Sequence, residues 1–250
     1  MHILLIDNSN SRTKFALGDA NALDEGWRGR LETQSVCEQS LDAALEGLAY
    51  DAVACASVVP EKAEAIRSYF ASRRIPLHMV NSSSPIGMAI DYPAPAQIGA
   101  DRLANAVGVV ARHGAPAIVI DFGTAVTFDV ISAAPAYCGG VIAPGLGAMS
   151  GYLTRRTALL PEVDLAEPQS AIGKSTADAM RIGAVIGYRG LVRGIIEAVL
   201  RELKGNPAII ATGGDARLIA NGLPEIMACD ADLTLDGIRR IALAAFKGTV

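Results

Sequence analysis

Two short segments of the sequence each carry an apolar run that ends in an aspartate. One run covers Leu4–Asp7 and continues through a polar turn to Thr13, and the other covers Ile118–Asp121 and continues to Thr127. Placing Asp7 on Asp121, 114 positions later, also places threonine on threonine. A β-hairpin built in this way presents a carboxylate and free backbone N–H groups at a strand end. Two such hairpins facing each other can hold a polyphosphate with its metal ions, so the repeat predicts a two-lobed, ATP-using enzyme.

The first turn is polar at every position, over Asp7, Asn8, Ser9, Asn10, Ser11, Arg12, Thr13 and Lys14. A lysine can bind phosphate as a point charge, and a carboxylate such as that of Asp7 can orient magnesium through water. The same residue types also form ordinary turns. Taken alone, this segment therefore leaves a purely structural role open.

The second turn strengthens the phosphate interpretation. Gly123 allows close approach of the backbone to a ligand, and Thr124 offers a hydroxyl beside it. Asp121 occupies the position that Asp7 holds in the first hairpin. The pair of similar turns favours a shared phosphate-binding role over two unrelated loops.

Gly213 and Gly214 follow an apolar run and precede a predicted helix. Glycines at such a turn let a flat ring or a ribose lie against the backbone. The alternative is a simple strand-to-helix turn capped by Asp215. Together with two phosphate hairpins, adenosine binding is the favoured interpretation.

Gly99-Ala100-Asp101-Arg102 places an acid and a base at the start of a predicted helix. Asp is a common residue at a helix N-terminus, where the helix dipole favours a negative charge. In the functional alternative, Asp101 accepts a proton from a substrate hydroxyl and Arg102 binds the substrate. Phosphoryl transfer needs a positioned nucleophile and a carboxylate within hydrogen-bonding reach.

The elements that must position these residues follow one scheme, which occurs twice. Strands are expected at 3–7, 14–17, 26–33, 52–57, 77–80, 117–121, 126–131, 136–142, 208–211 and 225–228. Helices are expected at 40–48, 61–74, 99–112, 145–154, 176–203, 215–221 and 235–246, and the proline-containing segment 81–96 is expected to be extended. Three antiparallel strands followed by alternating helices and strands predict two mixed α/β lobes, 1–112 and 113–250.

Composition restricts the function classes. The formal net charge of −4 gives no electrostatic reason to bind nucleic acid or an acidic membrane. No apolar run approaches the roughly 20 residues that cross a bilayer. Four widely spaced cysteines without a C-x-x-C pair indicate reduced thiols in a cytoplasmic protein, and three scattered histidines give no zinc-binding spacing.

The long helix expected at 176–203 carries glycines at steps of four, three and four residues, namely Gly183, Gly187, Gly190 and Gly194. These positions share one face of a helix. Each glycine lowers helix stability by roughly 1 kcal/mol relative to alanine, so a second backbone is expected to approach this face. That backbone belongs either to the same lobe or to a second subunit.

Taken together, these motifs resemble those of the type III pantothenate kinases, in the superfamily of actin, hexokinase-type sugar kinases and seventy-kilodalton heat-shock chaperones. The resemblance runs from about Ile3 to Phe246. It depends on the order and spacing of the following segments: Asp7–Lys14, Tyr92 with its prolines, Gly99–Arg102, Asp121–Thr127, Gly139–Gly145, Gly173–Thr176 and Thr212–Asp215.

The resemblance implies two tandem ribonuclease H-like lobes with an ATP cleft between them, and ATP-dependent phosphorylation of pantothenate, the first step of coenzyme A synthesis. Asp7 to Lys14 and Thr124 would contact ATP phosphates with Mg²⁺, and Asp121 would bind a monovalent cation, K⁺ or NH₄⁺. Asp101 would be the general base. Tyr92, Gly99, Ala100, Asp101, Arg102 and Thr176 would line the pantothenate site. Such enzymes are homodimers, with ATP and pantothenate as their ligands.

One position departs from the pattern of that family. Ser9 stands where the family usually has glycine, and its Cβ and hydroxyl predict weaker or altered contact with ATP. A non-catalytic nucleotide-binding regulatory relative is therefore one alternative. Another small-molecule kinase of the same superfamily is the second. The intact Asp101 and Asp121 favour an active enzyme, and the segment from Tyr92 to Arg102 favours pantothenate as its substrate.

Overall fold

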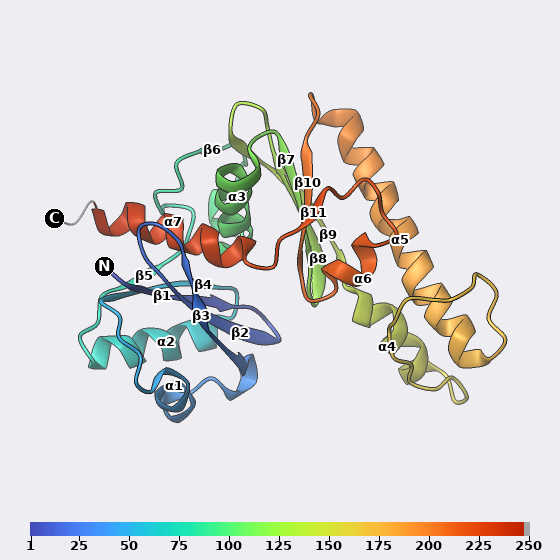
Figure 1. The fold of residues 1–250 in the computed structure, drawn as a ribbon, viewed down its shortest axis with the longest axis horizontal. Coiled ribbons are helices and arrows are strands. Elements are labelled where there is room, and N and C mark those ends of the chain that lie inside the picture. The colour runs from blue at the N-terminus through green and yellow to red at the C-terminus, as the bar shows by residue number, and fades with distance from the viewer. Residues whose placement is uncertain (248–250) are drawn as a thin grey trace. The chain divides into compact units, whose positions relative to one another are not determined.

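A computed structural model of the chain describes residues 1–247, apart from the side chain of Ser150, and divides into two compact units (Figure 1). Unit 1 comprises Met1–His113 together with the C-terminal segment from Asp232 onward, and unit 2 comprises Gly114–Ala231. The lobe boundary predicted from the sequence places residues 113–250 in one lobe. The C-terminal helix instead packs on unit 1, because its apolar face contacts another helix and the central strands there.

Unit 1 is built on one five-stranded sheet in the order β3-β2-β1-β4-β5. β1 pairs antiparallel with β2 and parallel with β4. All six residues of β1 are buried, as expected for a strand in the middle of a covered sheet. The strands are β1 (Ile3–Asn8), β2 (Arg12–Gly18), β3 (Leu23–Glu32), β4 (Ala52–Ser57) and β5 (Leu77–Met79).

Helices flank this sheet. α1 (Glu38–Leu45) and α2 (Pro60–Ser72) bury Leu41 and Phe70 in a cluster that includes Ile6 of β1. α3 (Ala100–His113) packs along α7 (Leu233–Lys247), and α7 also contacts β1. α3 has an acid in its first turn and bases in its last turn, which complements the helix dipole.

Unit 2 repeats the same strand arrangement. β7 pairs antiparallel with β8 and parallel with β10, just as β1 pairs with β2 and β4. β8 pairs antiparallel with β9, and β10 pairs parallel with β11. The strands are β7 (Ala117–Phe122), β8 (Ala125–Ile131), β9 (Ala136–Pro144), β10 (Ala208–Gly213) and β11 (Ala228–Cys229). The repeated hairpin motif is therefore part of a repeated fold.

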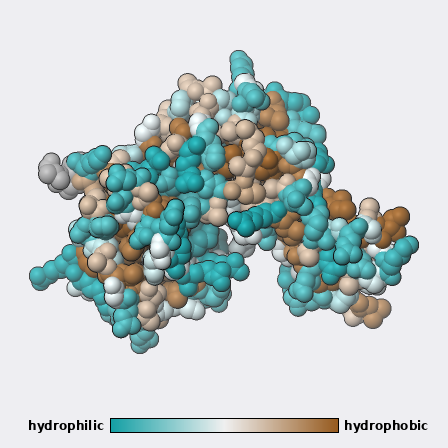
Figure 2. Space-filling model, viewed as in Figure 1, coloured by the Kyte–Doolittle hydropathy of each residue, from teal (hydrophilic) through white to brown (hydrophobic). Residues whose placement is uncertain are grey.

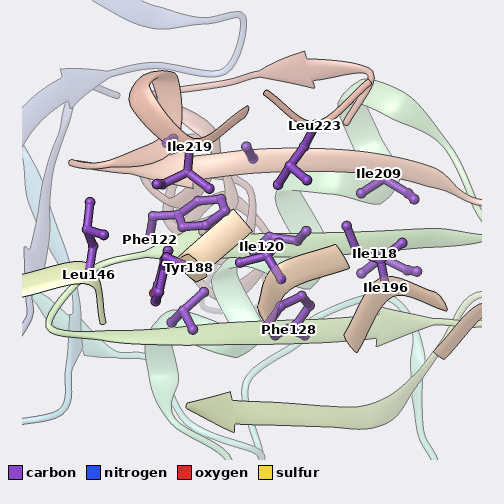
Figure 3. Packing of buried hydrophobic residues seen from close by; sticks show 14 of the residues in the cluster. Ile118, Ile120, Phe122, Phe128, Leu146, Tyr188, Ile196, Ile209, Ile219 and Leu223 are labelled. Atoms are coloured by element: carbon purple, nitrogen blue, oxygen red, sulfur yellow. The ribbon is translucent and has the colours of Figure 1, made fainter. Parts of the chain in front are cut away.

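The core of unit 2 lies between this sheet and the long helix α5 (Thr176–Glu202) (Figure 3). Phe122 of β7 and Phe128 of β8 face Tyr188 and Ile196 of α5, all fully buried. α4 (Leu146–Arg156) contacts α5, and the short α6 (Ala216–Ala220) adds Ile219 to the core. Core packing on one face of the sheet therefore holds the β7–β8 hairpin in place.

The predicted elements agree with the structure except at a few places. The strand expected at 225–228 is the shorter β11, because 224–227 form a turn before it. The extended segment 81–96 contains the short β6 (Ala89–Ile90) and begins the 3₁₀ turn η2 (Pro95–Gln97). A second 3₁₀ turn, η1 (Thr33–Ser35), follows β3. Over the part of the chain that the structure describes, no helix is long and apolar enough to cross a membrane.

Candidate functional site

The turn between β1 and β2 is held in a fixed shape by a buried polar network. Asn8 lies opposite Thr13 in the hairpin, and its amide Nδ2 donates to Thr13 Oγ1 at 2.7 Å. Thr13 Oγ1 lies 3.0 Å from Thr33 Oγ1, which donates to the carbonyl oxygen of Ser9 at 2.6 Å. Ser57 Oγ, at the end of β4, donates to Asn8 Oδ1 at 2.6 Å. The side chains of Asn8 and Thr13 therefore support the turn from inside, while Asn10, Ser11 and Arg12 form its exposed edge.

Asp7 and Lys14 place opposite charges next to this turn. Lys14 Nζ lies 3.5 Å from Asp7 Oδ2, and Ser9 Oγ donates to Asp7 Oδ1 at 2.9 Å. The Asp7 side chain is almost completely buried, whereas that of Lys14 is 40% exposed. A buried carboxylate beside a solvent-accessible ammonium and a turn with exposed residues is suited to an anion that carries a cation with it.

The segment Gly99–Arg102 lies at the same edge of the unit 1 sheet. Val58, just after β4, donates its N–H to the carbonyl oxygen of Asn8 at 3.1 Å. A Cβ added at Gly99 would lie 3.5 Å from Val58 Cγ1 and 2.5 Å from Asp101 Oδ1. Glycine at this position therefore leaves the carboxylate of Asp101 in its present orientation. Asp101 thus lies near the end of β1, and its role as a general base stays a prediction.

Asp101 sits in the first turn of α3, where its Oδ1 accepts the N–H of Arg102 at 2.8 Å. Ala100 is buried, and both Asp101 and Arg102 are partly exposed. Tyr92 is also in unit 1, partly buried in the irregular stretch between β6 and η2. A partly exposed carboxylate with an ordered backbone contact can serve as a cap and can still accept a proton from a ligand.

In unit 2, Asp121 precedes the turn between β7 and β8. Gly123 and Thr124 are exposed at the tip of this turn. The N–H of Gly145 donates to the carbonyl oxygen of Thr124 at 3.1 Å, and a Cβ at Gly145 would overlap the backbone of the turn. The tight packing explains why glycine stands at 145, at the start of α4.

The turn with Gly213 and Gly214 lies against this second hairpin. Thr212 and Gly213 are opposite Asp121 and Phe122 in the parallel β10–β7 pair. Gly213 has φ of +94°, and a Cβ there would lie 2.6 Å from Asp121 Oδ1. Asp215 donates its N–H to the carbonyl oxygen of Phe122 at 3.3 Å. The predicted adenosine turn and the predicted cation ligand are therefore neighbours.

Thr176 is the first residue of α5 and is exposed. The N-cap is the preceding Ser175, whose Oγ accepts the N–H of Asp178 at 3.1 Å and donates to its Oδ2 at 2.7 Å. Thr176 belongs to unit 2, whereas Tyr92 and Gly99–Arg102 belong to unit 1. The capping interactions leave the Thr176 side chain outside the cap itself.

The carboxylates of Asp7 and Asp121 are suited to cations that bind together with a ligand. Within residues 1–247, no group of three or more His, Cys, Asp or Glu side chains could hold a metal ion. Asp7 supplies one carboxylate, which fits a Mg²⁺ ion otherwise coordinated by phosphate oxygens and water. Asp121 supplies one carboxylate beside a turn, which fits a weakly held monovalent ion.

Sequence reasoning missed Thr33 and Ser57. Both are hydroxyl residues that follow or end a predicted strand, and both face the Asn8–Thr13 pair. Val58, which links the end of β4 to Asn8, was missed as well. A polar residue at the end of an otherwise apolar strand was the available signal, but nothing in the linear sequence connected these positions with residues 8–13.

Comparisons with known proteins agree with this arrangement. A family model described as type III pantothenate kinase matches residues 3–198. The type III pantothenate kinase of Akkermansia muciniphila is 52% identical over 239 residues, covering 96% of this chain and 97% of the relative. That of Methylacidiphilum infernorum is 41% identical over 250 residues, covering 98% of this chain and 89% of the relative.

A solved structure supports the fold. MreB 5 of Spiroplasma citri, bound to AMPPNP, has a TM-score of 0.56 at 10% identity, covering 99% of this chain and 98% of its own. The predicted α/β class, with two lobes that each contain a mixed sheet and flanking helices, is confirmed, and the likeness to MreB 5 shows a shared fold. With the family model and two relatives above 40% identity, the chain belongs to the type III pantothenate kinase family.

Proposed function

We propose a residue-level mechanism for the activity of this family, the ATP-dependent phosphorylation of pantothenate to 4'-phosphopantothenate in coenzyme A biosynthesis. The chain is a kinase that transfers phosphate to a hydroxyl of pantothenate. The observation that carries the mechanism is the placement of Asp101 and the Asp7–Lys14 turn at one edge of the unit 1 sheet. A base and a phosphate-binding turn in one unit can act on the same transferred group.

The phosphates of ATP bind to the turn residues Asp7 to Lys14 and to Thr124. Backbone N–H groups, the partly buried Ser9 and the exposed Asn10, Ser11 and Arg12 supply donors, and Lys14 supplies a positive charge. The buried side chains of Asn8 and Thr13 support this turn, because their hydrogen bonds fix its backbone. Asp7 would orient, through water, the Mg²⁺ that accompanies ATP, and this ion would neutralise phosphate charge.

Asp101 is the general base. It accepts the proton of the pantothenate hydroxyl while the hydroxyl oxygen forms a bond to the γ-phosphorus and the bond to the bridging oxygen of ADP breaks. Arg102, directly after it, binds the substrate. Its own N–H already orients the Asp101 carboxylate at 2.8 Å. Tyr92, Gly99, Ala100 and Thr176 line the pantothenate site.

Asp121 binds a monovalent cation, K⁺ or NH₄⁺. ATP adds several negative charges near the carboxylate of Asp121, and a monovalent cation offsets part of that charge. The adjacent glycines Gly213 and Gly214 bind the adenosine portion. A Cβ added at Gly213 would lie 2.6 Å from Asp121 Oδ1, and this proximity supports a common location for the two functions.

The active form is a homodimer joined through α5. Cβ atoms added at Gly183, Gly187, Gly190 or Gly194 would meet nothing within 4 Å among the described residues. Packing within unit 2 therefore does not explain why glycines occupy this face of α5. This supports contact with a second subunit. Figure 2 shows hydrophobic residues at the surface around α4 and α5, where the structure exposes Tyr152, Leu159, Ile172 and Ile186.

The deciding experiment is a coupled assay of ADP release in Mg²⁺ and K⁺, with and without pantothenate. Pantothenate-dependent ADP release that yields phosphorylated pantothenate by mass spectrometry is the expected result. A panel of hydroxylated acids and sugars serves as the control for another kinase specificity. Nucleotide binding without any pantothenate-dependent release would contradict the proposed function and favour a binding protein.

A further inference from the structure

Arg189 is a buried arginine in the middle of α5, with only 8% of its surface exposed. Its Nε donates to the carbonyl oxygen of Ile219 at 3.1 Å, and its Nη2 donates to that of Leu218 at 2.6 Å. Both acceptors belong to α6. The last carbonyl groups of a helix have no partner within the helix, and Arg189 donates to two of them. The carbonyl oxygen of Ile219 also accepts the N–H of Gly222 at 3.2 Å.

A carboxylate completes this contact. The two terminal nitrogens of Arg189 donate to Glu167 at 2.8 and 2.6 Å, in the bidentate geometry that is strong and directional. These hydrogen bonds hold the pKa of Glu167 below its usual range. A Cβ at Gly222, just after α6, would lie 2.5 Å from Arg189 Nε. Glu167 and the backbone at Gly222 therefore both pack closely against the guanidinium group of Arg189.

The other end of α6 carries the proposed nucleotide turn. α6 has only five residues, which is about 7.5 Å of helix. Asp215 precedes it and is bonded to the backbone of Phe122, and Gly213 lies against Asp121. Because so short a helix moves as one body, holding its C-terminal end also sets the position of the turn at its N-terminal end.

Tyr188, the residue before Arg189, helps to position a second turn. Tyr188 donates its hydroxyl to the carbonyl oxygen of Pro144 at 3.2 Å, and Pro144 leads into Gly145, which packs on the Gly123–Thr124 turn. Two consecutive residues of α5 thus hold the two segments that flank the second hairpin. The middle of α5 is therefore a support for the whole edge of this sheet.

We propose that Arg189 is a positioning residue for the nucleotide, which it serves by fixing α6 and with it the Gly213–Gly214 turn against Asp121. The inference rests on the proposed role of that turn in binding adenosine. Arg189 touches neither substrate. Its loss should therefore weaken ATP and ADP binding while leaving the recognition of pantothenate unchanged.

The test is Arg189→Met, which keeps much of the side-chain volume and removes the five donors. We expect the KM for ATP to rise roughly tenfold, since small misplacements of binding groups have effects of this size. The KM for pantothenate should stay within about twofold, and the Kd for Mg·ADP by calorimetry should rise in step with the KM for ATP. Arg189→Lys, which keeps one donor group, should give an intermediate shift.

Arg73→Met is the matched control, because it removes an arginine that pairs with Glu38 and Asp42 on α1. It should leave the KM for ATP unchanged. If Arg189→Met does not fold, Glu167→Gln removes the charge of the partner alone and should shift the same parameter to a smaller extent. Equal increases in both KM values, or an unchanged Kd for Mg·ADP, would overturn the inference.

The two proposals can fail separately. A wild-type protein without pantothenate-dependent turnover would contradict the proposed function, yet Mg·ADP affinity would still report on Arg189. A wild-type protein with that turnover, and an Arg189→Met variant with unchanged nucleotide affinity, would contradict only the role of Arg189.

Discussion

Ser9 Oγ donates a hydrogen bond of 2.9 Å to Asp7 Oδ1, so the hydroxyl expected to alter contact with ATP engages the buried carboxylate of its own turn. Lys14 Nζ lies near the other oxygen of the same carboxylate, at 3.5 Å. Asp7 is therefore shared between a hydroxyl and an ammonium. A Mg²⁺-bound water that approaches Asp7 must compete with the Ser9 hydroxyl for one of these oxygens.

Ser9→Gly should lower the KM for ATP, because it removes this competition and clears the Cβ from the turn. A hydrogen bond to a charged group contributes about 1.5–3 kcal/mol, which limits the change in KM to roughly 10- to 150-fold. Ser9→Ala is the control, since it removes the hydroxyl and keeps the Cβ. A KM for ATP that rises in Ser9→Gly would show that Ser9 contributes a contact to the nucleotide.

Asp101→Asn should lower kcat by about 10²–10⁴-fold, the usual contribution of a general base. Asparagine keeps the shape of the side chain and can still accept the N–H of Arg102, so the start of α3 should remain intact. The affinity for Mg·ADP and the circular dichroism spectrum should be unchanged. Wild-type turnover in this variant would remove Asp101 from the reaction and leave it as a helix cap.

The order of elements was predictable because local patterns determine it. The apolar run Ile3–Ile6 predicts a buried strand, and the proline at the start of α2 predicts a helix N-terminus, both without reference to the rest of the chain. The position of α7 was not predictable in this way. Its place in unit 1 depends on a close crossing with α3, where Gly237 packs against the backbone of Ala104. Packing between segments so far apart in sequence leaves no local sequence pattern.

The site was predictable to the same degree. The hairpin residues and the glycine turn are recognisable by type, but their neighbourhood comes from the parallel pairing of β7 with β10, which brings Gly213 beside Asp121 across roughly 90 residues of sequence. The supports Thr33, Ser57 and Arg189 could not be found, because each acts on a segment distant in sequence. Sequence patterns thus predict candidate residues in the turns, but not the distant residues that support those turns.

Replacing K⁺ with Li⁺ should lower kcat if Asp121 holds a monovalent cation. Lithium is smaller and more strongly hydrated, so one carboxylate and a turn are a poor substitute for its water shell. Asp121→Asn should have low activity that no longer depends on which ion is present. Equal rates in K⁺ and Li⁺ for the wild-type protein would argue against a cation at Asp121.

Gly187→Glu should convert a dimer into a monomer, since it places a charged side chain in the middle of the open face of α5. Light scattering after size-exclusion chromatography measures this as a fall toward the mass of one chain, 25.9 kDa. Arg67→Glu on α2, which changes a surface ion pair, is the control and should stay dimeric. A dimer that survives Gly187→Glu would place the subunit contact elsewhere.

Asp236 of α7 should make a large, pH-dependent contribution to the stability of unit 1. It is 3% exposed, and its two oxygens accept hydrogen bonds from Arg239 and Arg240, both at 2.8 Å. Burial alone would raise the pKa of Asp236, but these two arginines outweigh it and the pKa is lowered. Arg239 also donates to the carbonyl oxygen of Asp19 at 2.8 Å, so the cluster ties α7 to the turn between β2 and β3.

Asp236→Asn should lower the free energy of unfolding by about 3–5 kcal/mol at pH 7, the range for removing one partner of a buried ion pair. A carboxyl group with a lowered pKa stabilises the fold above its unfolded value of about 3.9 and loses that effect as the pH falls through the folded value. The difference between wild type and variant in urea unfolding should therefore shrink below about pH 4. Asp51→Asn, at an exposed pair with the N-terminus, should change stability by at most about 0.5 kcal/mol at either pH. A difference that stays constant from pH 7 to pH 3 would mean that packing, and not the charge of Asp236, holds α7 in place.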